Sequence, residues 1–173
     1  MKKTTKILAS AVAAIAIFFS VNANAQDTRK FGIGLNAGFP TNDGYSFAIG
    51  GDLRYQFDVS KQLSIPITAG FTSIQGEDVT IGTTTISYRY NYVPVKAGLK
   101  YFFNDSGAGV YGLAEAGAAF GTDSGAGTEF VFSPAIGYAW SNGLDLAAKY
   151  EGIPANGGTL GYVGIRLAYG FKL

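Results

Sequence analysis

Charged side chains recur at alternate positions in several segments, on the face opposite to a run of apolar residues. The set comprises Asp52, Asp58, Glu115, Asp145 and Glu151, together with Arg54, Lys96, Lys100, Lys149, Arg166 and Lys172. Five acidic groups stand against six basic groups, so the charges nearly cancel. Such a set predicts either an ion path or a network of ion pairs, because buried charges need partners. We favour the network, and assign it to all of these residues except Asp58 and Lys172.

Catalytic and metal-binding chemistry is poorly represented in the chain. It contains no histidine and no cysteine, the residues most often used for proton transfer and for transition-metal binding. The pairs Asp105-Ser106 and Asp123-Ser124 are adjacent residues of the kind that form turns rather than nucleophilic sites. Gly32-Ile33-Gly34 lies within a predicted strand with no helix after it, so it does not indicate a phosphate loop. We therefore predict no catalytic residue, no metal and no cofactor.

The elements that position the charged residues are strands. In the last segment, residues 160–173, the side chains of Val163, Ile165, Leu167 and Tyr169 alternate with Gly164, Arg166, Ala168 and Gly170. A period of two places alternate residues on opposite faces of a strand. Similar patterns predict strands at 30–39, 45–57, 63–72, from about 86 to 103, 110–120, 130–140 and 144–150. These lengths are near the roughly 9 to 11 residues that a tilted strand needs to cross a bilayer.

The two faces of the predicted strands indicate which solvent surrounds them. A soluble lipocalin-type barrel would place the apolar face inside, around a ligand cavity. Its outer face would then be rich in glycine, alanine and serine, which is a poor coat in a chain with 25 glycines and only 14% charged residues. The same small residues suit the narrow lumen of a membrane barrel. We therefore predict an all-β fold, an eight-stranded antiparallel up-and-down transmembrane β-barrel.

An export signal precedes the strands. Lys2, Lys3 and Lys6 form a basic start, residues 7–21 are almost uninterruptedly apolar, and Ala23-Asn24-Ala25 supplies a small-residue cleavage site. The apolar run is shorter than the roughly 20 residues of a spanning helix, which argues against a membrane anchor. We predict a cleaved signal peptide at 1–25 and a single barrel domain at 26–173. The mature chain would carry 10 basic and 12 acidic residues, without the basic footprint of a nucleic-acid-binding protein.

The connections predict an orientation. The turns after the second, fourth and sixth strands are short, whereas residues 73–85 form the longest connection and are rich in threonine. Outer-membrane barrels have short periplasmic turns and longer outer loops, and aromatic residues gather at both ends of the predicted strands, as at membrane interfaces. The sequence therefore predicts a bacterial outer-membrane protein with both mature termini in the periplasm. Because Pro66 lacks a backbone donor, we also expect a bulge or weak pairing there.

Residues 30–173 resemble the small eight-stranded outer-membrane barrels, namely OmpA-type transmembrane domains, OmpX and the outer-membrane-protein β-barrel domain family. The closing run Leu167-Ala168-Tyr169-Gly170-Phe171-Lys172-Leu173 looks like the terminal signal read by the barrel-assembly machinery, although it ends in leucine where an aromatic is typical and has Ala168 where glycine is usual. The resemblance implies partners in that machinery, outer-membrane lipids and lipopolysaccharide. It implies no enzyme, since enzymatic membrane barrels use a histidine. We expect no peptidoglycan-binding domain after the last strand.

The interior of an eight-stranded barrel is just wide enough to be filled by side chains. We therefore predict a non-enzymatic barrel with a filled lumen and a structural or surface-interaction role through its outer loops. The alternative is a narrow or gated pore for small solutes.

Folding each hairpin about its turn predicts the pairs Glu115–Lys96 and Asp145–Arg166. The loops carry no motif that identifies a ligand, although their acidic residues would either bind divalent cations or be simply solvated. These acidic residues are Asp43, Glu77, Asp78, Asp123 and Glu129.

Overall fold

The segments with alternating apolar and polar residues form a closed antiparallel barrel in the computed structural model. The structure describes residues 29–77, 79–81, 84–86, 88–123, 125–155 and 157–172. Eight strands close in the order β1-β10-β9-β8-β7-β6-β3-β2. Their bounds are β1 Arg29–Pro40, β2 Tyr45–Asp58, β3 Leu63–Gly76, β6 Arg89–Phe102, β7 Gly109–Gly121, β8 Thr128–Ala139, β9 Leu144–Ala155 and β10 Gly158–Lys172. The predicted all-β, eight-stranded antiparallel fold is confirmed. Within the described ranges, no helix is long and apolar enough to cross a membrane.

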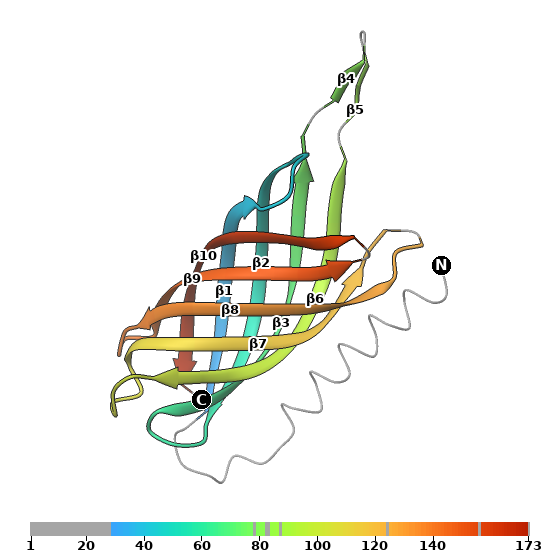
Figure 1. Cartoon of the computed structure of the whole chain (residues 1–173). Helices are drawn as coiled ribbons and strands as arrows, with labels where there is room; N and C mark the ends of the chain where they lie inside the picture. The colour runs from blue at the N-terminus through green and yellow to red at the C-terminus, as the bar shows by residue number, and fades with distance from the viewer. Residues whose placement is uncertain are drawn as a thin grey trace.

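The barrel closes where the first strand meets the last. β1 pairs with β10 from Lys30 opposite Lys172 to Pro40 opposite Tyr162, without an interruption. On its other side β1 pairs with β2 over a similar length. Figure 1 shows the strands wrapping around one axis, with the red end of β10 beside the blue start of β1. Closure satisfies the backbone groups of both terminal strands, which a bilayer requires because its hydrocarbon core offers no water.

The barrel has the polarity of a membrane protein. Outward residues such as Leu35 and Phe39 are apolar and expose 67% and 72% of their surface, whereas inward Arg54 and Lys96 expose 5% and 3%. This is the reverse of a soluble barrel, where the exposed face is polar. The outward face therefore matches lipid, and the inward face encloses the charges.

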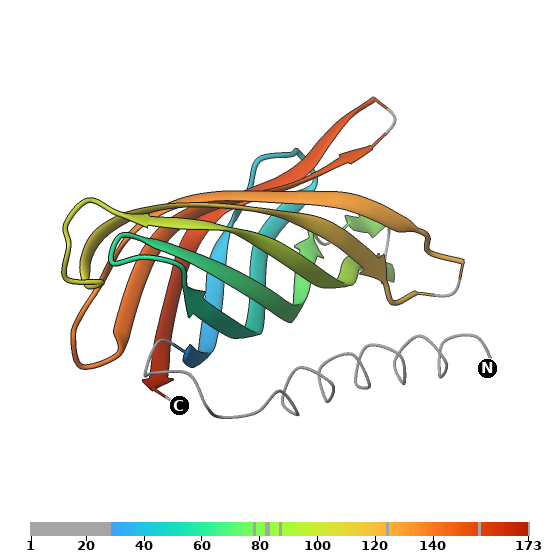
Figure 2. The same ribbon diagram turned by 90° about the horizontal axis from the view of Figure 1, so that it is seen from below.

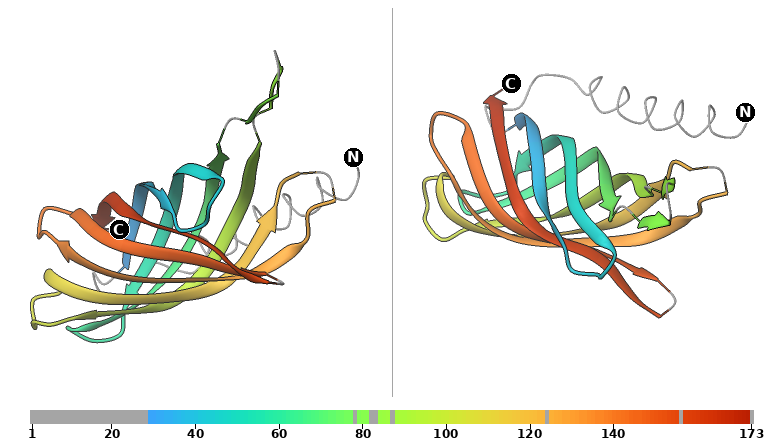
Figure 3. Two further views of the ribbon diagram at one scale, coloured as in Figure 1. Left: turned by 45° about the horizontal axis from the view of Figure 1, so that its top comes forward. Right: turned by 90° about the horizontal axis from the view of Figure 1, so that it is seen from above.

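Long and short connections lie at opposite ends of the barrel. The turns from β2 to β3, from β6 to β7 and from β8 to β9 share one end of the barrel (Figure 2). The N-terminal end of β1 and the C-terminal end of β10 lie at the same end. At the other end a small two-stranded sheet, β4 Val79–Ile81 and β5 Thr84–Ile86, stands out beyond the rim (Figure 3). We call it the projecting hairpin.

Two predicted loops are partly strand. The segment 73–85 was expected to be a connection, but β3 continues to Gly76 and the projecting hairpin occupies most of the remainder. Its residues include threonine, valine and isoleucine, which favour extended backbone. Likewise β9 and β10 continue to Ala155 and from Gly158, so little of the expected loop at 152–159 remains. Backbone pairing in these hairpins continues past the apolar part of the strands. The sequence there no longer alternates between apolar and polar residues, so it does not identify the strand ends.

At Pro66 the structure shows the weak pairing that was expected, without a bulge. The pairing of Pro66 with Gln56 on β2 lies in an unbroken register, and the register shift between β2 and β3 falls instead at Tyr45 and Phe47. The β3–β6 register passes from Ser64 opposite Lys100 directly to Ile67 opposite Ala97. In an antiparallel ladder a residue directs its N–H and C=O to the same neighbour. The missing donor therefore weakens only the ladder toward β6.

Candidate functional site: a charged network inside the barrel

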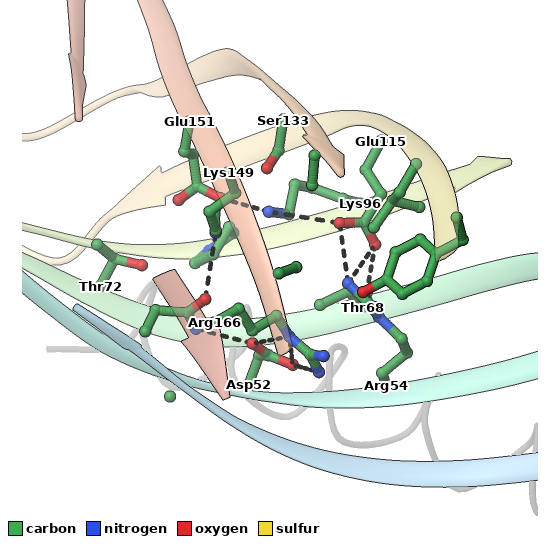
Figure 4. Close-up of a pocket in the computed structure, with 17 residues that line it drawn as sticks. Asp52, Arg54, Thr68, Thr72, Lys96, Glu115, Ser133, Lys149, Glu151 and Arg166 are labelled. Carbon is green, nitrogen blue, oxygen red and sulfur yellow. Dashed lines mark hydrogen bonds and ion pairs between the residues drawn. The ribbon is translucent and has the colours of Figure 1, made fainter. Parts of the chain in front are cut away.

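The predicted network residues lie together in the lumen. All nine are buried, and they come from β2, β6, β7, β9 and β10: Asp52, Arg54, Lys96, Lys100, Glu115, Asp145, Lys149, Glu151 and Arg166. Figure 4 shows seven of them, all except Lys100 and Asp145. Period-two alternation explains their direction, since each occupies an inward position of its strand. Space for them comes partly from glycine: a Cβ at Gly34 would lie 2.6 Å from the Arg166 guanidinium.

Asp52 and Arg166 form a two-point ion pair between β2 and β10. Arg166 Nη2 donates to Asp52 Oδ1 at 2.6 Å, and Arg166 Nε donates to Oδ2 at 2.9 Å. Asn36 on β1 donates a third hydrogen bond to Asp52 Oδ2 at 2.8 Å. This parallel geometry is the strong form of an arginine–carboxylate interaction, and it ties together the three strands around the barrel closure.

Glu115 on β7 is held mainly from β2 and β3. Arg54 Nη2 donates to both of its oxygens, at 3.3 and 3.2 Å, and Thr68 Oγ1 donates to Oε1 at 2.6 Å. Arg54 Nε in turn donates to Thr68 Oγ1 at 3.1 Å. The carboxylate is thus bound by groups from across the lumen.

Glu151 on β9 has two cationic partners. Lys96 Nζ donates to its Oε2, Lys149 Nζ donates to the same oxygen at 3.0 Å, and Tyr92 OH donates to Oε1 at 2.7 Å. Lys149 also reaches Asn36 Oδ1 at 3.3 Å. This cluster connects continuously to the Asp52 pair through Asn36.

Asp145 binds Lys100 and Tyr111. Lys100 Nζ donates to Oδ2 at 2.7 Å, and Tyr111 OH donates to Oδ1 at 2.6 Å. The same ammonium lies 3.8 Å from the centroid of the Tyr111 ring, which adds a cation–π interaction. A charge pair and an aromatic face therefore hold this lysine in place.

The two predicted hairpin pairs are present only as long contacts. Lys96 Nζ lies 3.9 Å from Glu115 Oε2, and Arg166 Nη1 lies 3.8 Å from Asp145 Oδ1. Each carboxylate has closer partners from other strands. The register explains the difference for Glu115, because Glu115 stands opposite Gly98 on β6 rather than Lys96.

Sequence reasoning missed the neutral members of the network, namely Asn36, Thr68, Tyr92 and Tyr111. The alternating pattern could have identified Tyr92, because its neighbour Val93 was assigned to the outward face and Tyr92 must then point inward.

Two charged residues were not assigned to the network. Of these, Asp58 pairs with Lys30 at 3.2 Å near the end that carries the short turns. Nothing is described for the Lys172 side chain.

A layer of buried apolar side chains lies inside the barrel toward the projecting hairpin. This apolar layer consists of Ala48, Ile74, Tyr92, Ala119, Val131, Ile153 and Tyr162. In the middle of the network there remains a cavity of about 10 Å³. A larger recess of about 500 Å³ lies at the end with the short turns, where Lys30, Gln56, Lys100 and Trp140 are among its lining residues. Among the described residues, no group of three metal-binding side chains comes together.

Residues 11–171 match the family model described as the outer membrane protein beta-barrel domain. This chain belongs to that family. The match and the closed eight-stranded fold confirm the expected resemblance, and they place the chain among barrels of the bacterial outer membrane. The predicted signal peptide at 1–25 lies outside the described residues and stays a prediction.

Solved structures show the same fold at low sequence identity. Ail, the attachment invasion locus protein of Yersinia pestis, is 16% identical with a TM-score of 0.57, over 85% of this chain and all of that chain. The N-terminal β-barrel domain of Pseudomonas aeruginosa OprF is 16% identical with a TM-score of 0.53, over 84% of this chain and all of that domain. The designed barrel TMB2.3 is 20% identical with a TM-score of 0.54, over 86% and 97%. Comparison with curated protein sequences produced no match.

Proposed function

We propose that this family member is a non-enzymatic outer-membrane barrel with a filled lumen, and that it acts through its outer loops. The main support for this proposal is the contrast between the packed interior of the barrel and one extended connection at its rim. The interior is packed with paired charges and an apolar layer, whereas one connection is extended into the projecting hairpin. A pore would need the opposite arrangement, with an unobstructed lumen.

Interactions at the rim support a role for the projecting hairpin. Glu77 N donates to Gly44 O at 2.8 Å, and Tyr88 OH donates to the same carbonyl at 2.8 Å. The Tyr88 ring also packs edge-on against Tyr45, with 5.8 Å between centroids. The base of the hairpin is therefore braced by the β1–β2 connection, which favours a defined position for a contact surface.

The charge of this end favours a neutral or basic partner. Exposed Asp43, Glu77, Asp123 and Glu129 lie there, with Arg89 as an exposed base. Ail has been crystallised with the heparin analogue sucrose octasulfate. An acidic rim would repel such a polyanion, so we propose a different class of partner for this chain, and lipopolysaccharide contacts limited to the lipid boundary.

The candidate nucleophile fragment at Asp105-Ser106 supports a non-enzymatic role. Ser106 Oγ donates to Asn104 Oδ1 at 2.9 Å and lies 3.0 Å from Ala108 O, so the hydroxyl serves the turn. The buried carboxylates of the lumen are each bound by a cation. None of them is left as a base in the described structure.

We further propose that the end with the short turns faces the periplasm, with both mature termini, and that the barrel-assembly machinery inserts the chain. The asymmetry of connections supports this orientation. The recess at that end is the observation that favours the alternative of a gated pore. A solute entering it would meet the charged network and then the apolar layer.

Planar-bilayer recording of the purified, folded protein tests the closed lumen. We expect no sustained conductance, and reproducible channel currents would refute the closed lumen and support the pore.

Replacing residues 77–87 by a short glycine–serine turn tests the loop function. Surface binding or an envelope phenotype should be lost while the heat-modifiable folded band on a gel remains. A phenotype that survives this change, and the trimming of the other outer loops, would refute the loop-borne role.

A further inference from the structure

The buried charges of the lumen do not sum to zero. Four carboxylates, Asp52, Glu115, Asp145 and Glu151, face five cations, Arg54, Lys96, Lys100, Lys149 and Arg166. With ordinary protonation the buried set carries one excess positive charge. The pair of Lys30 and Asp58 is itself balanced and does not offset it. An uncompensated charge in a buried site is costly, so a counter-charge is favoured there.

The excess lies beside Glu151. Asp52, Glu115 and Asp145 each have one principal cation, which is Arg166, Arg54 or Lys100 respectively. Glu151 instead receives both Lys96 and Lys149 on one oxygen. Two ammonium groups thus share a single carboxylate charge in the centre of the barrel.

An unused hydrogen-bond donor lies in the same region. Arg54 is 5% exposed, and its Nε and Nη2 bind Thr68 and Glu115. Its Nη1 has no hydrogen-bond partner among the residues that the structure describes. A buried guanidinium N–H without an acceptor loses its solvation without replacement.

The residues that carry these two features line one cavity. The central space of about 10 Å³ is bordered by Arg54, Lys96, Lys149 and Arg166, together with the carboxylates Asp52, Glu115 and Glu151 (Figure 4). Four cations and three carboxylates again leave one positive charge. The volume is on the order of that needed for a single water molecule. Chloride is somewhat larger than water but is a single atom, whereas sulfate or an organic carboxylate is much larger.

We propose that this cavity is a binding site for one halide ion, with chloride as the physiological class of ligand. The ion accepts a hydrogen bond from Arg54 Nη1 and balances the charge shared by Lys96 and Lys149. It therefore completes the electrostatics of the lumen. The site does not depend on the outer loops, so its test is separate from that of the proposed function.

Stability in matched salts tests the site. The folded barrel is unfolded with urea in sodium chloride, sodium bromide and sodium gluconate at equal ionic strength. A ligand that binds only the folded state raises the midpoint in a saturable, concentration-dependent way. We expect this shift with chloride and bromide beyond that in gluconate. Equal midpoints in the three salts would overturn the proposal, and would mean that water or a neutral lysine balances the site.

Two variants localise the effect. Lys149→Met equalises the buried charges at four and four while Glu151 keeps Lys96 and Tyr92, so the halide shift should disappear. Lys30→Met changes a lysine at the barrel end and should retain the full shift. If Lys149→Met does not fold, bromide-soaked crystals of the unaltered protein decide the question. An anomalous peak within contact distance of Arg54 Nη1 supports the site, and its absence at saturating bromide refutes it.

Discussion

Arg54 on β2 and Glu115 on β7 meet across the barrel, with 3.2 Å between Nη2 and Oε2, although 61 residues separate them in the sequence. Neither strand is a hydrogen-bonded neighbour of the other. The pair is therefore a cross-brace of the lumen. Its side chains expose only 6% and 3% of their surface, so loss of one partner would leave a buried charge.

Arg54→Met should destabilise the barrel by roughly 3 to 5 kcal/mol, because it removes the principal cation of buried Glu115. Lys96→Met should cost less, since Glu151 keeps Lys149 and Tyr92. Reversible urea unfolding in detergent micelles measures both. An equal loss for the two variants would contradict the assignment of partners.

Lys30→Met is the matched control for these variants. Its pair with Asp58 lies near the barrel end, with side chains 27% and 19% exposed. Ion pairs that water reaches contribute about 0 to 1 kcal/mol. A large loss of stability in this variant would show that position in the barrel does not determine the strength of the pairs.

Gly34→Ala should be more destabilising than Gly32→Ala, by about 1 to 3 kcal/mol. A Cβ at Gly34 would lie 2.6 Å from Arg166 Nη2, whereas the nearest atom at Gly32 is 3.4 Å away. Arg166 cannot yield freely, because Asp52 binds it at two points. The same unfolding experiment compares the two, and a double variant with Arg166→Met should abolish the difference.

Leu35→Arg tests the lipid-facing side. Leu35 lies at the middle of β1 and exposes 67% of its surface, so an arginine there should cost about 2 to 4 kcal/mol in a bilayer. Phe103→Arg, at the end of the barrel, should cost about 0 to 1 kcal/mol. Unfolding from liposomes gives both values, and similar costs at both depths would contradict the proposed span.

Processing gives a separate test of the export signal. The motif Ala23-Asn24-Ala25 predicts cleavage before Gln26. Intact-mass measurement of the protein purified from outer membranes should show a chain of residues 26–173. Recovery of the full-length chain from that fraction would refute the signal-peptide prediction.

The inward direction of the nine charged residues could be predicted from the sequence. Backbone geometry alone sends alternate side chains to opposite faces, so the apolar neighbours of Arg54 or Arg166 determine where the charge points. The same periodicity predicted all eight barrel strands. It could not predict where β3 and β9 end, because pairing beyond the membrane no longer requires an apolar face.

Partners inside the lumen were decided by the tertiary structure. Sequence reasoning could pair residues only across a shared turn, which led to Lys96 for Glu115 and Arg166 for Asp145. Barrel closure brings β2 opposite β7, and it brings β10 back to β1 and β2. In this narrow interior each long basic side chain can reach carboxylates on several strands. Alternation is a property of each strand by itself, whereas the choice of partner depends on how all eight strands curve around the same space.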